Sequence, residues 1–157
     1  MERASSAALA AGLVTGLLVG STTVTGSPAS AATPAVQYGR AAFDATNDQR
    51  VRHDRRRLQR GDCLRDFAAR HARRMAAREE IWHQDLQRVL EVCDLSWAGE
   101  NVAAGFPSGR AVVKDGWMDS KSHRENLLAR KFRRMSVVAR EGDDGRWYVS
   151  QVLGRTA

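Results

Sequence analysis

The chain has 157 residues, a formal net charge of +7 and an isoelectric point of about 10.4. This length predicts one domain rather than two. No nucleic-acid-binding motif and no aromatic residues interleaved with basic ones accompany the positive charge, so a nucleic-acid partner is excluded.

The N-terminus has the pattern of an export signal. Arg3 precedes an apolar stretch over 7–20, and the small residues at 29–31 form a cleavage site. We therefore predict a signal peptide over 1–31, cut after Ala31, and a secreted, extracellular mature chain. The apolar stretch is shorter than the roughly 20 residues that span a bilayer, although an uncleaved anchor is the alternative. The mature chain has no second apolar stretch, so no integral membrane span is expected in it.

Outside the cell, a basic protein meets anionic polymers and anionic surfaces. The net charge of +7 favours cell-wall polymers, lipids and other anionic envelope components as partners. The alternative is a solvated, arginine-rich surface without a specific partner.

The first elements of the mature chain are predicted to be helical. Residues 32–39 are small and are interpreted as a short flexible lead-in to a domain over 40–157. Apolar residues then recur at helical spacing over 40–54 and, more regularly, over 63–79. Asp62 directly precedes the second of these helices and suits an N-cap.

The chain has two cysteines, Cys63 and Cys93. In an oxidising compartment, two cysteines in one small domain usually pair. A disulfide here would close a loop of about 30 residues and contribute roughly 3–4 kcal/mol. Two buried free thiols are the alternative, because sequence alone does not establish the geometry.

The middle of the chain is more mixed. A short helix is expected over 85–92, a turn leading to a short segment near the core over 99–105, and an apolar helical stripe over 110–119. Ser122 and Glu125 have the spacing of a capping box that would start another helix.

The last part of the chain predicts two strands. The segments 135–140 and 146–153 are separated by Glu-Gly-Asp-Asp-Gly, which is typical of a hairpin turn. Helices come first and strands last, which favours an α+β fold.

Three residues could carry chemistry. A carboxylate from Glu100 with imidazoles from His83 and His123 would suit acid–base work or three ligands to a divalent metal such as zinc. Their positions in the chain form no signature by themselves. His71 lies on the apolar face of a helix and is interpreted as a hydrogen-bonded core residue. The chain lacks H-E-x-x-H, G-x-S-x-G and P-loop motifs, and paired cysteines would leave no thiol nucleophile.

Several motifs, in order, resemble those of one family. They are Asn47-x-x-Arg50, Leu64-x-x-Phe67-Ala68-x-x-His71-Ala72-x-x-Met75-Ala76, Trp82-His83-x-Asp85-Leu86, Gly99-Glu100-Asn101-Val102-Ala103-x-Gly105, Val112-Val113-x-x-Gly116-Trp117-Met118-x-Ser120, Ser122-His123-Arg124-x-Asn126-Leu127-Leu128 and Trp147-Tyr148-Val149-x-Gln151-x-x-Gly154. Together they resemble the bacterial branch of the CAP superfamily, which includes cysteine-rich secretory proteins, insect antigen 5 and plant pathogenesis-related group-one proteins.

The resemblance implies a fold and a site. The fold would be α+β, a three-layer α-β-α sandwich with a mainly antiparallel central sheet. A cleft would hold His83 and Glu100, with His123 facing the same cleft. Asn101 would fix the loop that follows Glu100.

The chain departs from the eukaryotic members of the family. Their tetrad of two histidines and two glutamates is incomplete here. Asp119 or Ser120 stands at the position of the second acid, and Tyr148 stands at that of the second histidine.

The resemblance leaves three functions open. The preferred one is a binding module for a lipid, a cell-wall component or a divalent metal. The second is a hydrolase, protease-like, in which Glu100 would be the general base or a metal ligand and His83 and His123 would be ligands or proton carriers. The third is a structural hydrogen-bond network.

Overall fold

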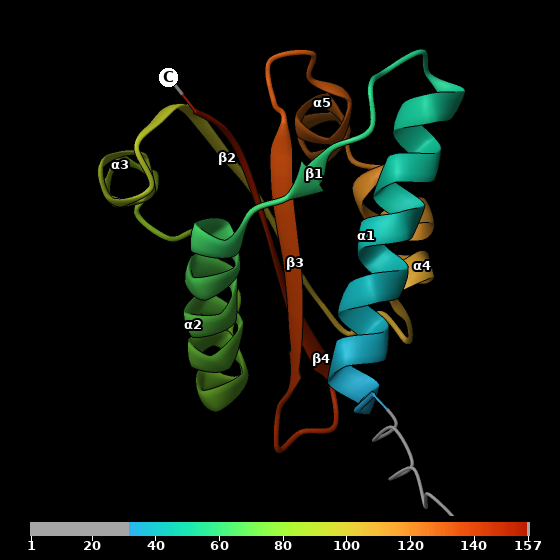
Figure 1. Ribbon diagram of the computed structural model, residues 1–157. Helices are drawn as coiled ribbons and strands as arrows, with labels where there is room; N and C mark the ends of the chain where they lie inside the picture. The colour runs from blue at the N-terminus through green and yellow to red at the C-terminus, as the bar shows by residue number, and fades with distance from the viewer. Residues whose placement is uncertain (1–31, 157) are drawn as a thin grey trace, which may run out of the picture. The chain divides into compact units, whose positions relative to one another are not determined.

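The computed structural model describes residues 32–156 (Figure 1), so the predicted signal peptide lies outside the described residues. No helix in the described part is long and apolar enough to cross a membrane. The elements are α1 Pro34–Arg52, β1 Gln59–Arg60, α2 Asp62–Arg78, α3 Leu86–Val92, β2 Leu95–Ala104, α4 Gly109–Ala111, the π-helix η1 Val112–Trp117, α5 Lys121–Leu128, β3 Arg134–Glu141 and β4 Trp147–Thr156.

The first helix begins earlier than its pattern indicated. Thr33 is the N-cap of α1, and its hydroxyl oxygen accepts a hydrogen bond from the backbone N–H of Val36 at 3.4 Å. Pro34 occupies the first helical turn, where its missing N–H and its fixed φ are favourable. The prediction of a flexible lead-in is therefore wrong for residues 34–39.

The second helix has the expected length but a different cap. Gly61, and not Asp62, is the N-cap of α2, and it makes no side-chain capping bond. Asp62 is instead the first helical residue, where a negative charge still favours the helix dipole. The short helix α3 follows as expected, and its N-cap Asp85 accepts from the backbone N–H groups of Gln87 and Arg88.

The sheet has four strands in the order β1-β3-β4-β2. Strands β3 and β4 form the expected antiparallel hairpin, and β4 also pairs antiparallel with β2. The two residues of β1 pair parallel with β3, so the sheet is mixed, although mainly antiparallel. The prediction of a turn over 99–105 is wrong for residues 99–104, because these residues form the C-terminal part of β2. Residues 99–103 are all buried, so they show no alternation of exposed and buried positions from which a strand could be recognised.

Helices cover both faces of this sheet, which gives the three layers of the expected α-β-α sandwich (Figure 1). Under α1, a core cluster joins Tyr38 and Ala42 to Val149 of β4. Under α2, a second cluster joins Leu64 and Phe67 to Val152. Residues of β4 thus face both layers, as the two-residue period of a strand requires.

The segment before α5 continues the helical structure after a single turn of α4. The π-helix η1 buries Val112, Val113 and Trp117. The N-cap of α5 is Ser120, without a side-chain capping bond. The predicted capping box is wrong because Ser122 already lies inside the first turn of the helix.

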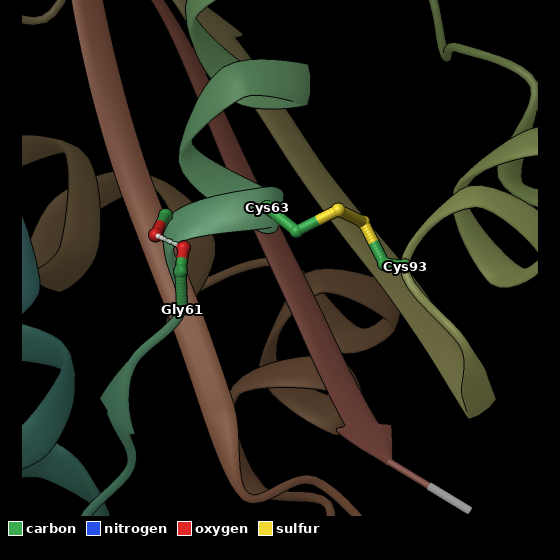
Figure 2. Close-up of a disulfide and its surroundings, with 4 residues drawn as sticks. Gly61, Cys63 and Cys93 are labelled. Atoms are coloured by element: carbon green, nitrogen blue, oxygen red, sulfur yellow. Dashed lines mark hydrogen bonds between the residues drawn. A yellow bond between two sulfur atoms is a disulfide. The ribbon is translucent and has the colours of Figure 1, made fainter.

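The cysteines are paired (Figure 2), so the alternative of free thiols is wrong. The disulfide between Cys63 and Cys93 joins the first turn of α2 to the end of α3, with the two Cα atoms 5.8 Å apart. Close by, the hydroxyl of Ser136 on β3 donates to the Gly61 carbonyl at 2.7 Å. The start of α2 is therefore held both by a covalent bond and by the sheet.

Candidate functional site

Glu100 lies in the middle of β2, opposite Val152 of β4, and its side chain is completely buried. Its carboxylate accepts four hydrogen bonds. Oε2 accepts from the backbone N–H of Gln84 at 3.0 Å and lies 3.0 Å from Nδ1 of His83. Oε1 accepts from Nε2 of Gln84 at 2.6 Å and from the hydroxyl of Ser150 at 3.2 Å. A buried charge of this kind is stable only when donors surround it.

His83 lies between α2 and α3, and 60% of its side-chain surface is exposed. The contact between Nδ1 and Glu100 orients the ring and places a proton on Nδ1. In the part of the chain that the structure describes, no hydrogen bond involves Nε2 of this ring. His83 is therefore an exposed imidazole whose orientation is set by a hydrogen bond to the buried carboxylate of Glu100.

His71 of α2 supports the same segment from inside the core. Its side chain is fully buried, and Nε2 lies 2.6 Å from the main-chain oxygen of Trp82. The Trp82 ring packs edge-on against the imidazole, with ring centroids 5.3 Å apart. Nε2 also lies 3.8 Å from Oε1 of Glu100. The prediction of a hydrogen-bonded core histidine is confirmed, and its partner is the residue that precedes His83.

His123 lies in the first turn of α5, and its main-chain oxygen accepts from Nδ2 of Asn101 at 3.2 Å. Burial lowers the pKa of His123, and the nearby charge of His83 lowers it further. His83 is thus close enough to influence the protonation of His123. Both effects keep the imidazole of His123 neutral to lower pH.

Asparagines attach α5 to β2. Nδ2 of Asn126 donates to the main-chain oxygen of Glu100 at 3.0 Å and to Oδ1 of Asn101 at 3.2 Å. Asn101 in turn donates to Oε1 of Gln151 on β4 at 2.9 Å. The prediction that Asn101 fixes a loop after Glu100 is wrong, because this residue lies inside strand β2 and its side chain instead bonds to α5 and β4. Through these hydrogen bonds, Asn126 holds α5, and with it His123, next to β2, the strand that contains Glu100.

Sequence reasoning missed two residues that contact the carboxylate, Gln84 and Ser150. Gln84 follows His83 directly, so its position in the chain was the one signal that could have found it. Ser150 lies 50 residues from Glu100 in the chain, and nothing in the sequence connects the two. Tyr148, at the position of the eukaryotic histidine, is buried, and its hydroxyl donates to Asp144 at 2.7 Å.

The structure does not arrange His83, Glu100 and His123 as a three-ligand metal centre. Among residues 32–156, no group of three or more His, Cys, Asp or Glu side chains is arranged to hold a metal ion. Both oxygens of Glu100 already accept hydrogen bonds, so this carboxylate fits the role of a partner behind His83 better than that of a ligand. Within residues 32–156, hollows of about 670 and 200 Å³ are lined by other residues and not by His83, Glu100 or His123. Zinc binding and a cleft at these residues stay predictions.

Known proteins share this architecture. An outer surface protein of Borrelia burgdorferi superposes with a TM-score of 0.68 at 18% identity, over 75% of this chain and 92% of that one. An extracellular protein of Bacillus anthracis that contains an SCP domain superposes with a TM-score of 0.66 at 27% identity, over 82% of this chain and 45% of that one.

A relative in sequence is the uncharacterized membrane protein YlbC of Bacillus subtilis, 29% identical over 120 residues. The match covers 72% of this chain but only 33% of the relative, so the chain spans about a third of that protein. The family model of CAP, the Cysteine-rich secretory protein family, matches residues 43–153 and so covers the described helices and strands from within α1 almost to the end of β4. The chain therefore belongs to the Cysteine-rich secretory protein (CAP) family.

Proposed function

We propose that this chain is an exported CAP domain that binds a ligand outside the cell through His83, with His123 beside it. The observation that supports this most directly is the pairing of an exposed imidazole with a fully buried, fully hydrogen-bonded carboxylate, 3.0 Å apart. Export would depend on the signal peptide over 1–31, and it agrees with the structural relative that is described as extracellular.

An imidazole held in this way has a defined chemistry. With the proton on Nδ1, the lone pair on Nε2 can accept from a hydroxyl group or bind a metal ion. When the ring is protonated, Nε2 donates to an anionic group instead. The ligand would therefore be a cell-wall component, a lipid headgroup or a divalent metal. The net charge of +7 would help to concentrate the anionic members of this set near the surface.

The environment of Glu100 favours binding over hydrolysis. A general base needs a free lone pair within reach of the water that it activates. The Glu100 side chain has no exposed surface, and four donors surround its oxygens. In a hydrolase the base would be His83, oriented by Glu100 as a histidine is oriented by an acid in other hydrolases.

Binding is tested on the mature chain with three probes: zinc by isothermal titration calorimetry, and insoluble cell wall and anionic lipid vesicles by cosedimentation. His83→Ala should weaken binding of one of these probes about tenfold or more. His53→Ala removes another exposed histidine, in the C-cap of α1, and serves as the matched control. Equal binding of all three probes by wild type and His83→Ala would overturn the proposal. Hydrolysis of a wall or peptide substrate that is lost in His83→Ala would establish the enzymatic alternative.

A further inference from the structure

The excess of positive charge in this protein lies in two short segments, 52–60 and 129–134. Together they contain nine Arg or Lys residues and one acidic residue, Asp54, which gives them a net charge of +8. The whole chain contains 25 Arg or Lys and 18 Asp or Glu, a net charge of +7, so all other residues together have a net charge of −1. The excess is therefore local and is not spread evenly over the protein.

The fold brings these two segments together. Nε of Arg55 donates to the main-chain oxygen of Leu128 at 2.9 Å, and the backbone N–H of Gln59 donates to the main-chain oxygen of Arg133 at 2.9 Å. Figure 1 shows the loop after α1, the loop after α5 and the C-terminal end of β4 at the same end of the domain, at the top of the view. We call segments 52–60 and 129–134 together the basic end.

Acidic side chains neutralise little of the basic end. Within residues 32–156, one of its nine basic residues forms an ion pair, Arg57 with Asp48 at 3.5 Å, and both of these side chains are about half exposed. Burial lowers the pKa of Arg50, and the charges of Arg55 and Arg133 lower it further. Like charges held this close repel one another, so an anionic partner would stabilise this end of the domain.

Two large apolar side chains are exposed beside these charges. Val51, in the last turn of α1, is 51% exposed, and Trp97, near the start of β2, is 49% exposed. Trp97 lies opposite Arg155 of β4, and Nζ of Lys131 lies 4.1 Å from the centroid of its ring. A soluble anionic polymer offers little apolar surface to such side chains. The interface of a lipid bilayer accepts both a tryptophan ring and the basic groups around it.

We propose that the basic end binds the surface of an anionic lipid bilayer. Its arginines would bind the headgroup phosphates, which a guanidinium group fits well. Trp97 and Val51 would enter the interfacial layer, and each nearby Lys or Arg would add to the attraction. The surface does not include His83 or Glu100, since Glu100 follows Trp97 by three residues, about 10 Å along the strand.

The test measures cosedimentation of the mature chain with two kinds of vesicle, phosphatidylglycerol mixed with phosphatidylcholine, and phosphatidylcholine alone. The protein should bind the anionic vesicles at least about tenfold more tightly, and about 0.5 M salt should remove most of this binding by screening. Tryptophan fluorescence should shift to shorter wavelength on binding, and the shift should be smaller in Trp97→Phe. Equal binding to both kinds of vesicle would overturn the proposal.

Two charge-reversed variants separate the basic end from the net charge of the protein. Arg56→Glu/Arg130→Glu changes two exposed residues of the basic end and should raise the vesicle Kd about tenfold or more. Arg73→Glu/Arg74→Glu changes the net charge equally, at exposed positions of α2, and should raise it less than about threefold. Equal weakening by both pairs would contradict the proposal. The effect of Arg56→Glu/Arg130→Glu should persist in a His83→Ala background, so this proposal and that for His83 can fail separately.

Two apolar variants separate a bilayer from an anionic polymer. Trp97→Ala should raise the vesicle Kd about fivefold. Val36→Ala is the control, because Val36 is 43% exposed but lies in the first turn of α1, at the other end of that helix, and it should have little effect. Thermal denaturation confirms that each variant is folded. Wild-type vesicle binding by Trp97→Ala, together with complete displacement of vesicles by soluble polyphosphate, would identify the basic end as a polymer site instead.

Discussion

The side chain of Asn126 and the main chain of Glu100 are joined by a hydrogen bond of 3.0 Å, which fastens α5 to the strand that bears the buried carboxylate. Arg124, from the same helix, donates to the main-chain oxygen of Met118 at 2.6 Å and fastens α5 to the end of η1. The family motif around His123 thus has a physical reason. Its arginine and asparagine hold a short helix, and with it the second histidine, against the sheet.

Removing the amide of Asn126 should destabilise the protein. Asn126→Ala leaves the Glu100 carbonyl and Oδ1 of Asn101 each without one donor, and we expect a loss of about 1–3 kcal/mol in the free energy of unfolding. Chemical denaturation measures it. Glu125→Ala, at the exposed neighbouring position, is the control and should change little. Equal stability of the two variants would show that the amide does not hold the helix.

Glu100 and His83 should respond differently to substitution. Glu100→Gln places a donor where four donors already converge, so we expect a loss of about 2–3 kcal/mol. His83→Ala removes an exposed ring and should cost less than about 1 kcal/mol. Thermal and chemical denaturation of both variants test this asymmetry. A larger loss in His83→Ala would mean that the imidazole has a structural role.

His71 should act as a positioning residue for the segment that carries His83. His71→Phe fills the space but removes the donor to the Trp82 carbonyl, which we expect to cost about 1–3 kcal/mol. His71→Gln retains an N–H donor and should recover part of this loss. The imidazole NMR signals of His83 should shift in His71→Phe more than in His71→Gln. Unchanged His83 signals in both variants would contradict the positioning role.

The disulfide should contribute a large part of the stability. It links residues 30 positions apart, and the double variant Cys63→Ala/Cys93→Ala should lose roughly 3 kcal/mol. Differential scanning calorimetry would show the loss as a lower Tm. Wild-type protein treated with a reductant should behave like the double variant. A Tm that reduction leaves unchanged would be incompatible with this contribution.

His123 should make stability depend on pH. Its pKa is lowered in the folded protein, first by burial and then by the charge of His83, from an ordinary value of 6.5. Below pH 6.5 the unfolded chain therefore binds a proton more readily than the folded one, so stability falls as the pH falls, until the folded pKa is passed. Denaturation midpoints from about pH 7.5 to 5 measure the effect. His123→Gln should remove this part of the pH dependence, and an unaltered slope would refute the assignment.

Much of the secondary structure follows from local signals. The apolar periodicity of α2, the cap at Asp85 and the turn between β3 and β4 each depend on residues a few positions apart. The prediction of a turn over 99–104 failed because tertiary packing buries residues 99–103 of β2 and leaves no alternation. The prediction of a flexible lead-in failed for a local reason, since Thr33 and Pro34 cap and start α1.

The candidate site also depends partly on local sequence patterns and partly on tertiary contacts. Motifs in the chain identified His83, Glu100 and His123, because each lies in a recognisable local pattern. Packing alone decided which contacts these residues make: Glu100 accepts hydrogen bonds from Gln84 and Ser150, and Asn126 attaches α5 to its strand. Hydrogen bonds depend on distances and angles between elements far apart in the chain, and only the packing of helices on a sheet sets these.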